Sequence, residues 1–133
     1  MFVPDFNNLS IMLKAVIFDM DGVLIDSEPI HFSAVVQVLN NLGINIEENY
    51  LNRFIGDTNE NMWQLVISEF NIENAPEKYI SEQVKSTIDC MMNGNYSTIE
   101  GVIDLLEELK YNDIIIGLAS SSPPNVIEAF IEK

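Results

Sequence analysis

The chain has 133 residues, 47% of them apolar, and its 21 acidic and 6 basic residues give a net charge of −15. This size suits one domain, or one small core with an inserted subdomain. The acidic balance argues against nucleic acids and anionic membranes as partners, because both attract basic surfaces. No apolar run reaches membrane-spanning length, and the first residues lack the pattern of a secretory signal. We therefore expect a cytoplasmic protein.

The chain opens with a segment that has no clear period, residues 1–11, which we expect to be a flexible leader. Residues 15–18 are apolar, rich in strand formers and followed by Asp19, a pattern typical of a buried parallel strand. Ser27, as N-cap, and Pro29 then predict the start of a helix, which Gly43 ends.

The middle of the chain is predicted to be helical. A short helix around 47–54 leads to a turn at 55–58, and Asp57 with Glu60 resembles a capping box for a helix over 59–70. A further helix over 77–92 carries Cys90, the only cysteine, for which we expect a buried free thiol in a reducing compartment. Because no strand intervenes between 28 and 94, these helices predict a compact helical insertion.

An alternation of helix and strand resumes after residue 95. A helix over 102–110 precedes an all-apolar strand over 114–119, which we expect to be buried on both faces. Ser120, Ser121 and Ser122 follow it, and Pro123 begins the last helix. Consecutive strands joined by a crossover are usually neighbours, so we expect 15–18 and 114–118 to pair in parallel. Asp19 and Ser120 would then lie side by side at one edge of the sheet.

Asp19 and Asp21 are the strongest chemical feature of the sequence. Two carboxylates one residue apart repel each other unless a cation lies between them, and oxygen ligands of this kind suit Mg²⁺ with a phosphate and waters. Open α/β sheets bind ligands at the carboxyl ends of their strands. An EF-hand is excluded because Gly22 is fourth and Ile30 twelfth when counted from Asp19. A solvated turn is the other alternative, since Asp and Gly favour turns.

The serine run is a second, weaker feature. A hydroxyl at a strand end, beside the free N–H groups of a starting helix, is suited to bind phosphate. Serine before proline is also an ordinary N-cap, so the run alone leaves both interpretations open.

The continuous string from Val16 to Pro29, VIFDMDGVLIDSEP, resembles the first motif of the haloacid dehalogenase superfamily, in the branch of β-phosphoglucomutase and sugar-phosphate phosphatases. Ser120 is similar to the second motif. The resemblance implies an α/β fold with a Rossmann-like core at 12–27 and 95–133, holding only part of the parallel sheet, and a helical cap at 28–94.

The same resemblance implies residue roles. Asp19 would attack phosphorus and form an aspartyl-phosphate, and Asp21 would act as general acid and base. Mg²⁺, the expected cofactor, would be bound by the Asp19 carboxylate and the Asp21 carbonyl, and Ser120, with Ser121 beside it, would hold the phosphoryl group.

In the cap, the resemblance implies that His31 and the loop containing Thr58 lie near the substrate. A lone histidine on an amphipathic helix is more often packed or solvated, which stays an alternative for His31. Asn59 replaces the arginine of the mutase pattern and so removes a charged phosphate clamp. Glu100 also stands where the family usually has proline.

The superfamily's third and fourth motifs, a lysine and an acidic pair, would lie beyond residue 133, so we expect a truncated product or the N-terminal piece of a longer protein. The leading expectation is a Mg²⁺-dependent phosphatase for a small phosphorylated metabolite. The alternatives are a hexose-phosphate mutase, and a catalytically incomplete fragment that serves as a binding or assembly module. Two strands would leave an unpaired sheet edge, which favours self-association or a complementing chain.

Overall fold

The computed structural model describes residues 13–47, 49–94 and 96–132. In chain order its elements are β1 (Ala15–Phe18), α1 (Glu28–Asn41), the 3₁₀-helix η2 (Tyr50–Phe54), α2 (Asn59–Phe70), α3 (Pro76–Asn93), α4 (Val102–Tyr111), β2 (Ile115–Leu118) and α5 (Pro124–Glu132). Each matches a predicted element to within about two residues, the ordinary uncertainty of an element's end, except η2, which begins three residues later than the short helix predicted around 47–54. The expected leader at 1–11 lies outside the described residues.

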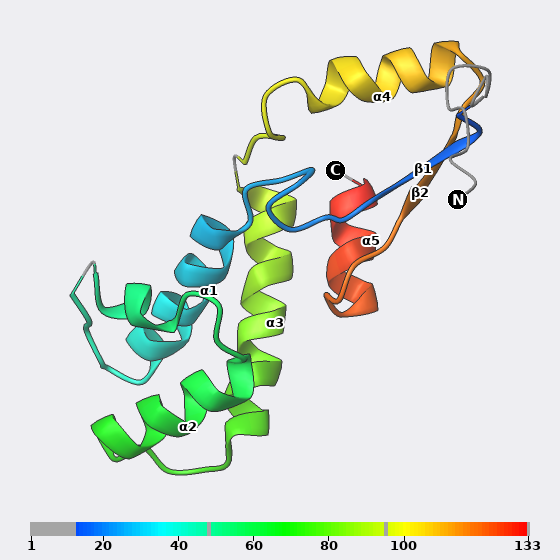
Figure 1. Ribbon diagram of the computed structural model, residues 1–133. Coiled ribbons are helices and arrows are strands. Elements are labelled where there is room, and N and C mark those ends of the chain that lie inside the picture. Colours follow the sequence, from blue (N-terminus) through cyan, green and yellow to red (C-terminus); the bar gives the residue numbers. More distant parts are fainter. Residues whose placement is uncertain (1–12, 48, 95, 133) are drawn as a thin grey trace, which may run out of the picture.

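The two strands pair in parallel, as predicted, and form a two-stranded sheet (Figure 1). The register places Ala15 opposite Ile115 and Phe18 opposite Leu118. Just past this pair, the amide of Ala119 donates to the carbonyl of Phe18 at 2.8 Å. Because the strands end level with each other, the residues that follow them, Asp19 and Ser120, emerge at the same edge of the sheet.

The prediction that these strands are buried is wrong for the described chain. The side chains of Ile17 and Ile115 are 72% and 70% exposed, and Ile116 is 41% exposed. An all-apolar strand is buried only when helices cover both faces of its sheet and other strands flank it. Among the described residues each strand has a single partner strand, so the apolar side chains remain in contact with solvent.

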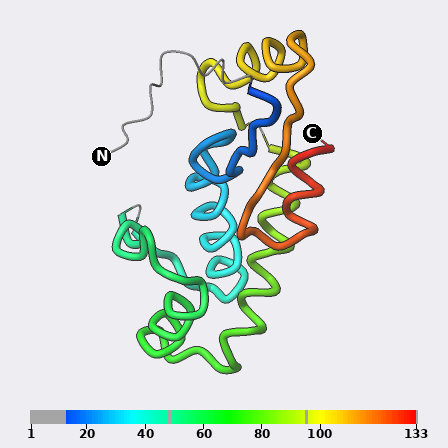
Figure 2. The backbone as a smooth tube through the Cα atoms, turned by 45° about the vertical axis from the view of Figure 1, so that its right-hand side comes forward, coloured from blue at the N-terminus to red at the C-terminus, as the bar shows by residue number. Residues whose placement is uncertain are grey.

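The helices between the strands form the larger core. Helix α3 packs along α1 and against α2, and its last turns pack against α5 (Figures 1 and 2). The buried side chains of this cluster come from α1, η2, α2 and α3: Val35, Val38, Leu39, Leu51, Phe54, Met62, Trp63, Val66 and Tyr79. Inside it the rings of Trp63 and Tyr79 stack with centroids 5.2 Å apart.

A second apolar cluster lies under the ends of the strands. It joins Met20 and Ile25, which follow β1, to Ile30 of α1, and it includes side chains of α3 and α5: Met91, Val126 and Ala129. Met20 and Ile25 are completely buried. This cluster therefore fixes the turn after β1 against the three helices around it.

Two predicted helix starts differ in detail from the structure. Ser27 occupies the N-cap position of α1, but its side chain makes no capping hydrogen bond. For α2 the predicted N-cap, Asp57, is wrong, because Thr58 holds that position and its hydroxyl accepts from the amide of Asn61. Asp57 instead accepts from the amide of Thr58 and the side chain of Asn61. No helix in the described ranges combines the length and apolar character needed to cross a membrane.

Candidate active site

The turn after β1 sets the positions of Asp19 and Asp21. Gly22 has a φ of +73°, which a residue with a Cβ rarely adopts, and its amide donates to the carbonyl of Ile25 at 2.9 Å. This closes a tight turn directly after Asp21. Asp19 is exposed, and one of its carboxylate oxygens accepts from the amide of Met20 at 2.7 Å. The two carboxylates thus share one edge of the sheet but differ in their access to solvent.

The serine run after β2 contacts this turn. The hydroxyl of Ser122 donates to Asp21 Oδ2 at 2.7 Å, a bond between residues 101 positions apart in the sequence. The hydroxyl of Ser120 accepts from the amide of Ser122 at 3.0 Å, so the first serine holds the third in place. We missed Ser122 as a site residue. The predicted parallel pairing was the available signal, because it places all three serines near Asp21.

Asp21 lies between opposing electrostatic influences. Burial raises its pKa, whereas the hydroxyls of Ser27 and Ser122 and the imidazole of His31 lower it, and the net result is a pKa below the ordinary value. His31 Nε2 lies 3.6 Å from Asp21 Oδ1, too long for a hydrogen bond. Oδ1 is buried, and no group in the described part of the chain hydrogen-bonds to it. The carboxylate therefore keeps one unsatisfied oxygen.

A cavity of about 330 Å³ opens beside Asp21. It lies between α1, the loop before α2 and the serine run, and it is lined by Asp21, Glu28, His31, Phe32, Val35, Phe54, Ile55, Gly56, Asp57, Thr58, Asn59, Met62, Gln83, Ser121, Ser122 and Pro123. Four predicted site residues are in this set: Asp21, His31, Thr58 and Ser121. Asp19 and Ser120 are outside it, at the ends of their strands.

Gln83, an amide side chain that lines the cavity, was not predicted as a site residue, whereas its partner Asn59 belongs to the loop predicted near the substrate. Gln83 of α3 is 2% exposed; its oxygen accepts from Trp63 Nε1 at 2.8 Å, and its nitrogen donates to Asn59 Oδ1 at 3.2 Å. These bonds fix the Asn59 amide at the cavity wall. Their spacing of 20 and 24 residues follows no local pattern, so the sequence carries no signal for them.

Comparison with known proteins identifies the family. The family model described as haloacid dehalogenase-like hydrolase matches residues 16–133. The chain belongs to the haloacid dehalogenase-like hydrolases. Curated relatives include a phosphorylated carbohydrates phosphatase of Thermotoga maritima, 31% identical over 84% of this chain, and the β-phosphoglucomutase of Bacillus subtilis, 28% identical over 83%. The alignments cover 51% of each relative, so the chain spans about half the length of these proteins.

A solved structure agrees with the fold assignment. A family IA, variant 3 hydrolase of the haloacid dehalogenase type from Entamoeba histolytica matches with a TM-score of 0.71 and 28% sequence identity, over 90% of this chain and 54% of that protein. The predicted α/β fold, an incomplete Rossmann-like core of this family, is thereby confirmed.

Enzymes of this family generally use Mg²⁺, and the donors at the end of β1 fit that ion only in part. The exposed carboxylate of Asp19 and the backbone carbonyl of Asp21 are hard oxygen ligands of the kind Mg²⁺ prefers. Within the described ranges, however, no three His, Cys, Asp or Glu side chains come together as a metal site. The residues present therefore supply part of an oxygen shell, and other groups must supply the rest.

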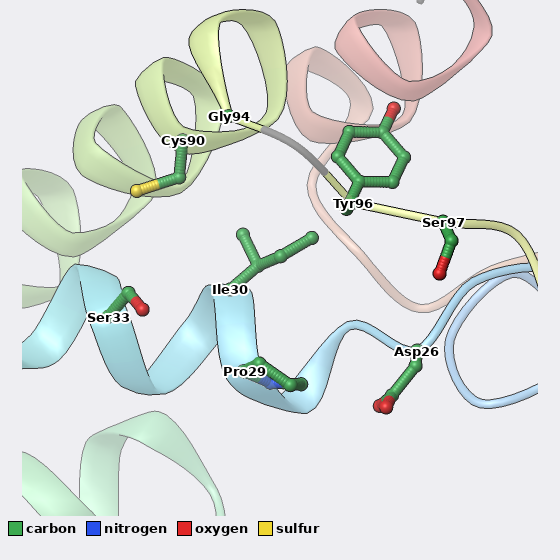
Figure 3. A pocket seen from close by; sticks show the side chains of 8 residues that line it. All are labelled: Asp26, Pro29, Ile30, Ser33, Cys90, Gly94, Tyr96 and Ser97. Atoms are coloured by element: carbon green, nitrogen blue, oxygen red, sulfur yellow. The ribbon is translucent and has the colours of Figure 1, made fainter.

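A second cavity, of about 370 Å³, lies where α1 begins and α3 ends (Figure 3). Its lining is Asp26, Pro29, Ile30, Ser33, Cys90, Gly94, Tyr96 and Ser97. Cys90 is only partly buried, which corrects the prediction of a buried thiol. None of the predicted catalytic or phosphate-binding residues borders this cavity, so it is not the candidate active site of this family member.

Proposed function

We propose that this chain carries the nucleophile, the acid–base residue and the phosphate-binding residues of a Mg²⁺-dependent phosphatase for small phosphorylated carbohydrates. One observation supports this above the others: Asp21, which lines a cavity, is hydrogen-bonded to the serine run after β2, with Asp19 at the same sheet edge. The family relationship and the phosphatase relative agree with this chemistry. The single cysteine accords with a cytoplasmic location.

In this proposal Asp19 is the nucleophile. An exposed carboxylate at a strand end is accessible to an incoming phosphate, and its attack on phosphorus forms an aspartyl-phosphate as the P–O bond to the alcohol breaks. Asp21 donates a proton to the departing alkoxide and later removes one from the water that hydrolyses the acyl phosphate. Ser120 and Ser121 donate hydrogen bonds to the phosphoryl oxygens. Mg²⁺, when bound at Asp19 and the Asp21 carbonyl, neutralises the negative charges that would otherwise repel the substrate.

We also propose the division into a core, residues 12–27 and 95–133, and a helical cap, residues 28–94. The cavity is lined by residues from both parts, which supports a substrate held between them. His31 would sit close to Asp21 in such a complex, and Thr58 would contact the part of the substrate beyond the phosphate.

Two alternatives remain from different classes. The similarity to β-phosphoglucomutase favours a hexose-phosphate mutase, in which Asp21 would activate a sugar hydroxyl in place of water. The other alternative is a catalytically incomplete chain that serves as a binding or assembly module; the chain spans about half of each of these relatives. In that alternative, Asp19 and the Asp21 carbonyl alone would bind Mg²⁺, and its binding would be weak.

The test is the release of phosphate from a panel of hexose and hexitol phosphates by the purified chain with Mg²⁺. We expect turnover, and we expect Asp19→Asn to reduce it to background while the circular dichroism spectrum is unchanged, because the amide cannot attack phosphorus. Asp26→Asn, an exposed acid outside the Asp21 cavity, is the matched control. Retained turnover in Asp19→Asn would rule out Asp19 as nucleophile, and an inactive wild-type chain would favour the binding module.

A further inference from the structure

The cavity beside Asp21 has a charge pattern that selects among phosphorylated compounds. We propose that it accepts phosphomonoesters whose remaining part is uncharged and hydroxylated, and that it discriminates against ligands with a second phosphate or a carboxylate at the far end. This inference rests on the proposed function, since it assumes that the transferred phosphate lies at Asp19 and the serine run.

The charges that line the cavity are predominantly negative. Glu28 of α1 and Asp57 of the loop before α2 border it together with Asp21, whereas its lining contains no lysine or arginine and only one histidine, His31. A second anionic group on the ligand would therefore approach carboxylates without a cation to compensate it. Juxtaposed like charges weaken binding strongly, and here we expect a loss of at least about tenfold.

The neighbouring arginine is engaged elsewhere. Arg53 immediately precedes the lining residue Phe54, yet its guanidinium pairs with Glu69 of α2. It also lies over the rings of Tyr50 and Phe54, 4.3 and 4.6 Å from their centroids. These contacts hold its charge away from the cavity, where a second phosphate would need it.

The cavity does offer hydrogen bonds that suit hydroxyl groups. Because Asn59 Oδ1 accepts from the buried amide of Gln83, the NH₂ group of Asn59, a lining residue of the cavity, stays available to donate. The Thr58 hydroxyl oxygen accepts from the amide of Asn61, which leaves its proton for donation. The carboxylates that line the cavity accept hydrogen bonds, whereas Asn59 and Thr58 can donate them. Because a hydroxyl group both donates and accepts, a polyol can bind to both kinds of lining group.

The decisive experiment compares three probes that differ only at one end: sorbitol 6-phosphate, 6-phosphogluconate and sorbitol 1,6-bisphosphate. Binding to the Asp19→Asn variant of the 133-residue chain, which would not hydrolyse the probes, is measured by calorimetry with Mg²⁺, with inorganic phosphate as a fourth ligand. We expect sorbitol 6-phosphate to bind at least about tenfold more tightly than the two probes with a charged end.

Two variants test the origin of this preference. Asn59→Arg should improve binding of the two charged-end probes by about tenfold relative to sorbitol 6-phosphate, because it supplies the missing cation. Gln64→Arg is the matched control: it adds the same charge on the same helix at an exposed position outside the cavity, and should leave the preference unchanged. Asp57→Asn, which removes a negative charge but keeps an amide oxygen, should weaken the preference if Asn59→Arg disturbs folding.

The outcomes separate this inference from the proposed function. Equal affinity for all three probes, or tighter binding of the bisphosphate, would overturn the inference and leave the phosphate site intact. Binding of inorganic phosphate without binding of sorbitol 6-phosphate would also overturn it alone. If none of the four ligands binds, the proposed function and the inference both fail.

Discussion

At the scale of single residues, Asp21 must both donate a proton and remove one in the proposed reaction. Its lowered pKa means that the folded chain favours the carboxylate, so the resulting stabilisation is present above the ordinary pKa of about 4 and is lost as the pH falls through the folded value. At neutral pH Asp21 is therefore ready to remove a proton. To donate a proton, Asp21 must first be protonated. A bound phosphate dianion favours the protonated form, because its negative charge raises the pKa of Asp21.

The contribution of Ser122 to the lowered pKa of Asp21 is measurable. Ser122→Ala removes a hydrogen bond to the charged form, so we expect the pKa of Asp21 to rise toward its ordinary value. A ¹³C carboxyl titration by nuclear magnetic resonance of the metal-free chain measures it. Ser121→Ala, in the same loop but without a hydrogen bond to Asp21 among those of the structure, is the control. A pKa that is the same in both variants would show that the Ser122 contact does not persist in solution.

At the scale of elements, the start of α2 determines the shape of one cavity wall. Because the Thr58 hydroxyl caps this helix, Thr58→Ala should lower the free energy of unfolding by about 1 kcal/mol. Urea denaturation followed by circular dichroism measures the difference. Thr58→Ser keeps the hydroxyl and should lie close to the wild type. If Thr58→Ala is as stable as Thr58→Ser, the N-cap role of Asp57 that we predicted from the sequence would be restored.

Whether an element could be predicted from the sequence depends on how far apart in the chain the interacting residues lie. Strand and helix positions depend on local periodicity, and the pairing of β1 with β2 follows from the rule for consecutive parallel strands, so both were predicted. Those two predictions alone bring Asp19, Asp21 and Ser120 to one sheet edge.

Other features of the site depend on side-chain packing between segments far apart in sequence. The hydrogen bonds of Ser122 to Asp21 and of Gln83 to Trp63 link different elements, and no periodicity encodes them. Thr58, and not Asp57, is the N-cap of α2. Both side chains are good N-caps and they are neighbours in the sequence, so propensity alone does not decide between them. Burial of the strands failed as a prediction because it depends on neighbours that are not among the described residues.

At the scale of the whole molecule, the strands and helices present an apolar surface to solvent. Ile17, Ile115 and Ile116 of the sheet and Ile103 and Leu105 of α4 are each at least 41% exposed. Exposed apolar patches of this kind mark interaction sites, and an unpaired strand edge adds free N–H and C=O groups to them. The net charge of −15 opposes contact between two copies, because like-charged molecules repel each other. Dissolved salt screens this repulsion and so weakens it.

We therefore predict that the 133-residue chain self-associates, and that association increases with salt. Sedimentation velocity at about 0.05 and 0.5 M salt should show a larger mean mass at the higher concentration, because the screening length falls from more than 10 Å to about 4 Å while apolar contacts persist. Ile115→Lys, in the exposed strand β2, should reduce the association, whereas Leu65→Lys, at a 50% exposed position on α2, should not. A complementing chain that covers the sheet would instead abolish self-association when added. A chain that stays monomeric at both salt concentrations and binds Mg²⁺ tightly would show that the exposed sheet face is stable without a partner.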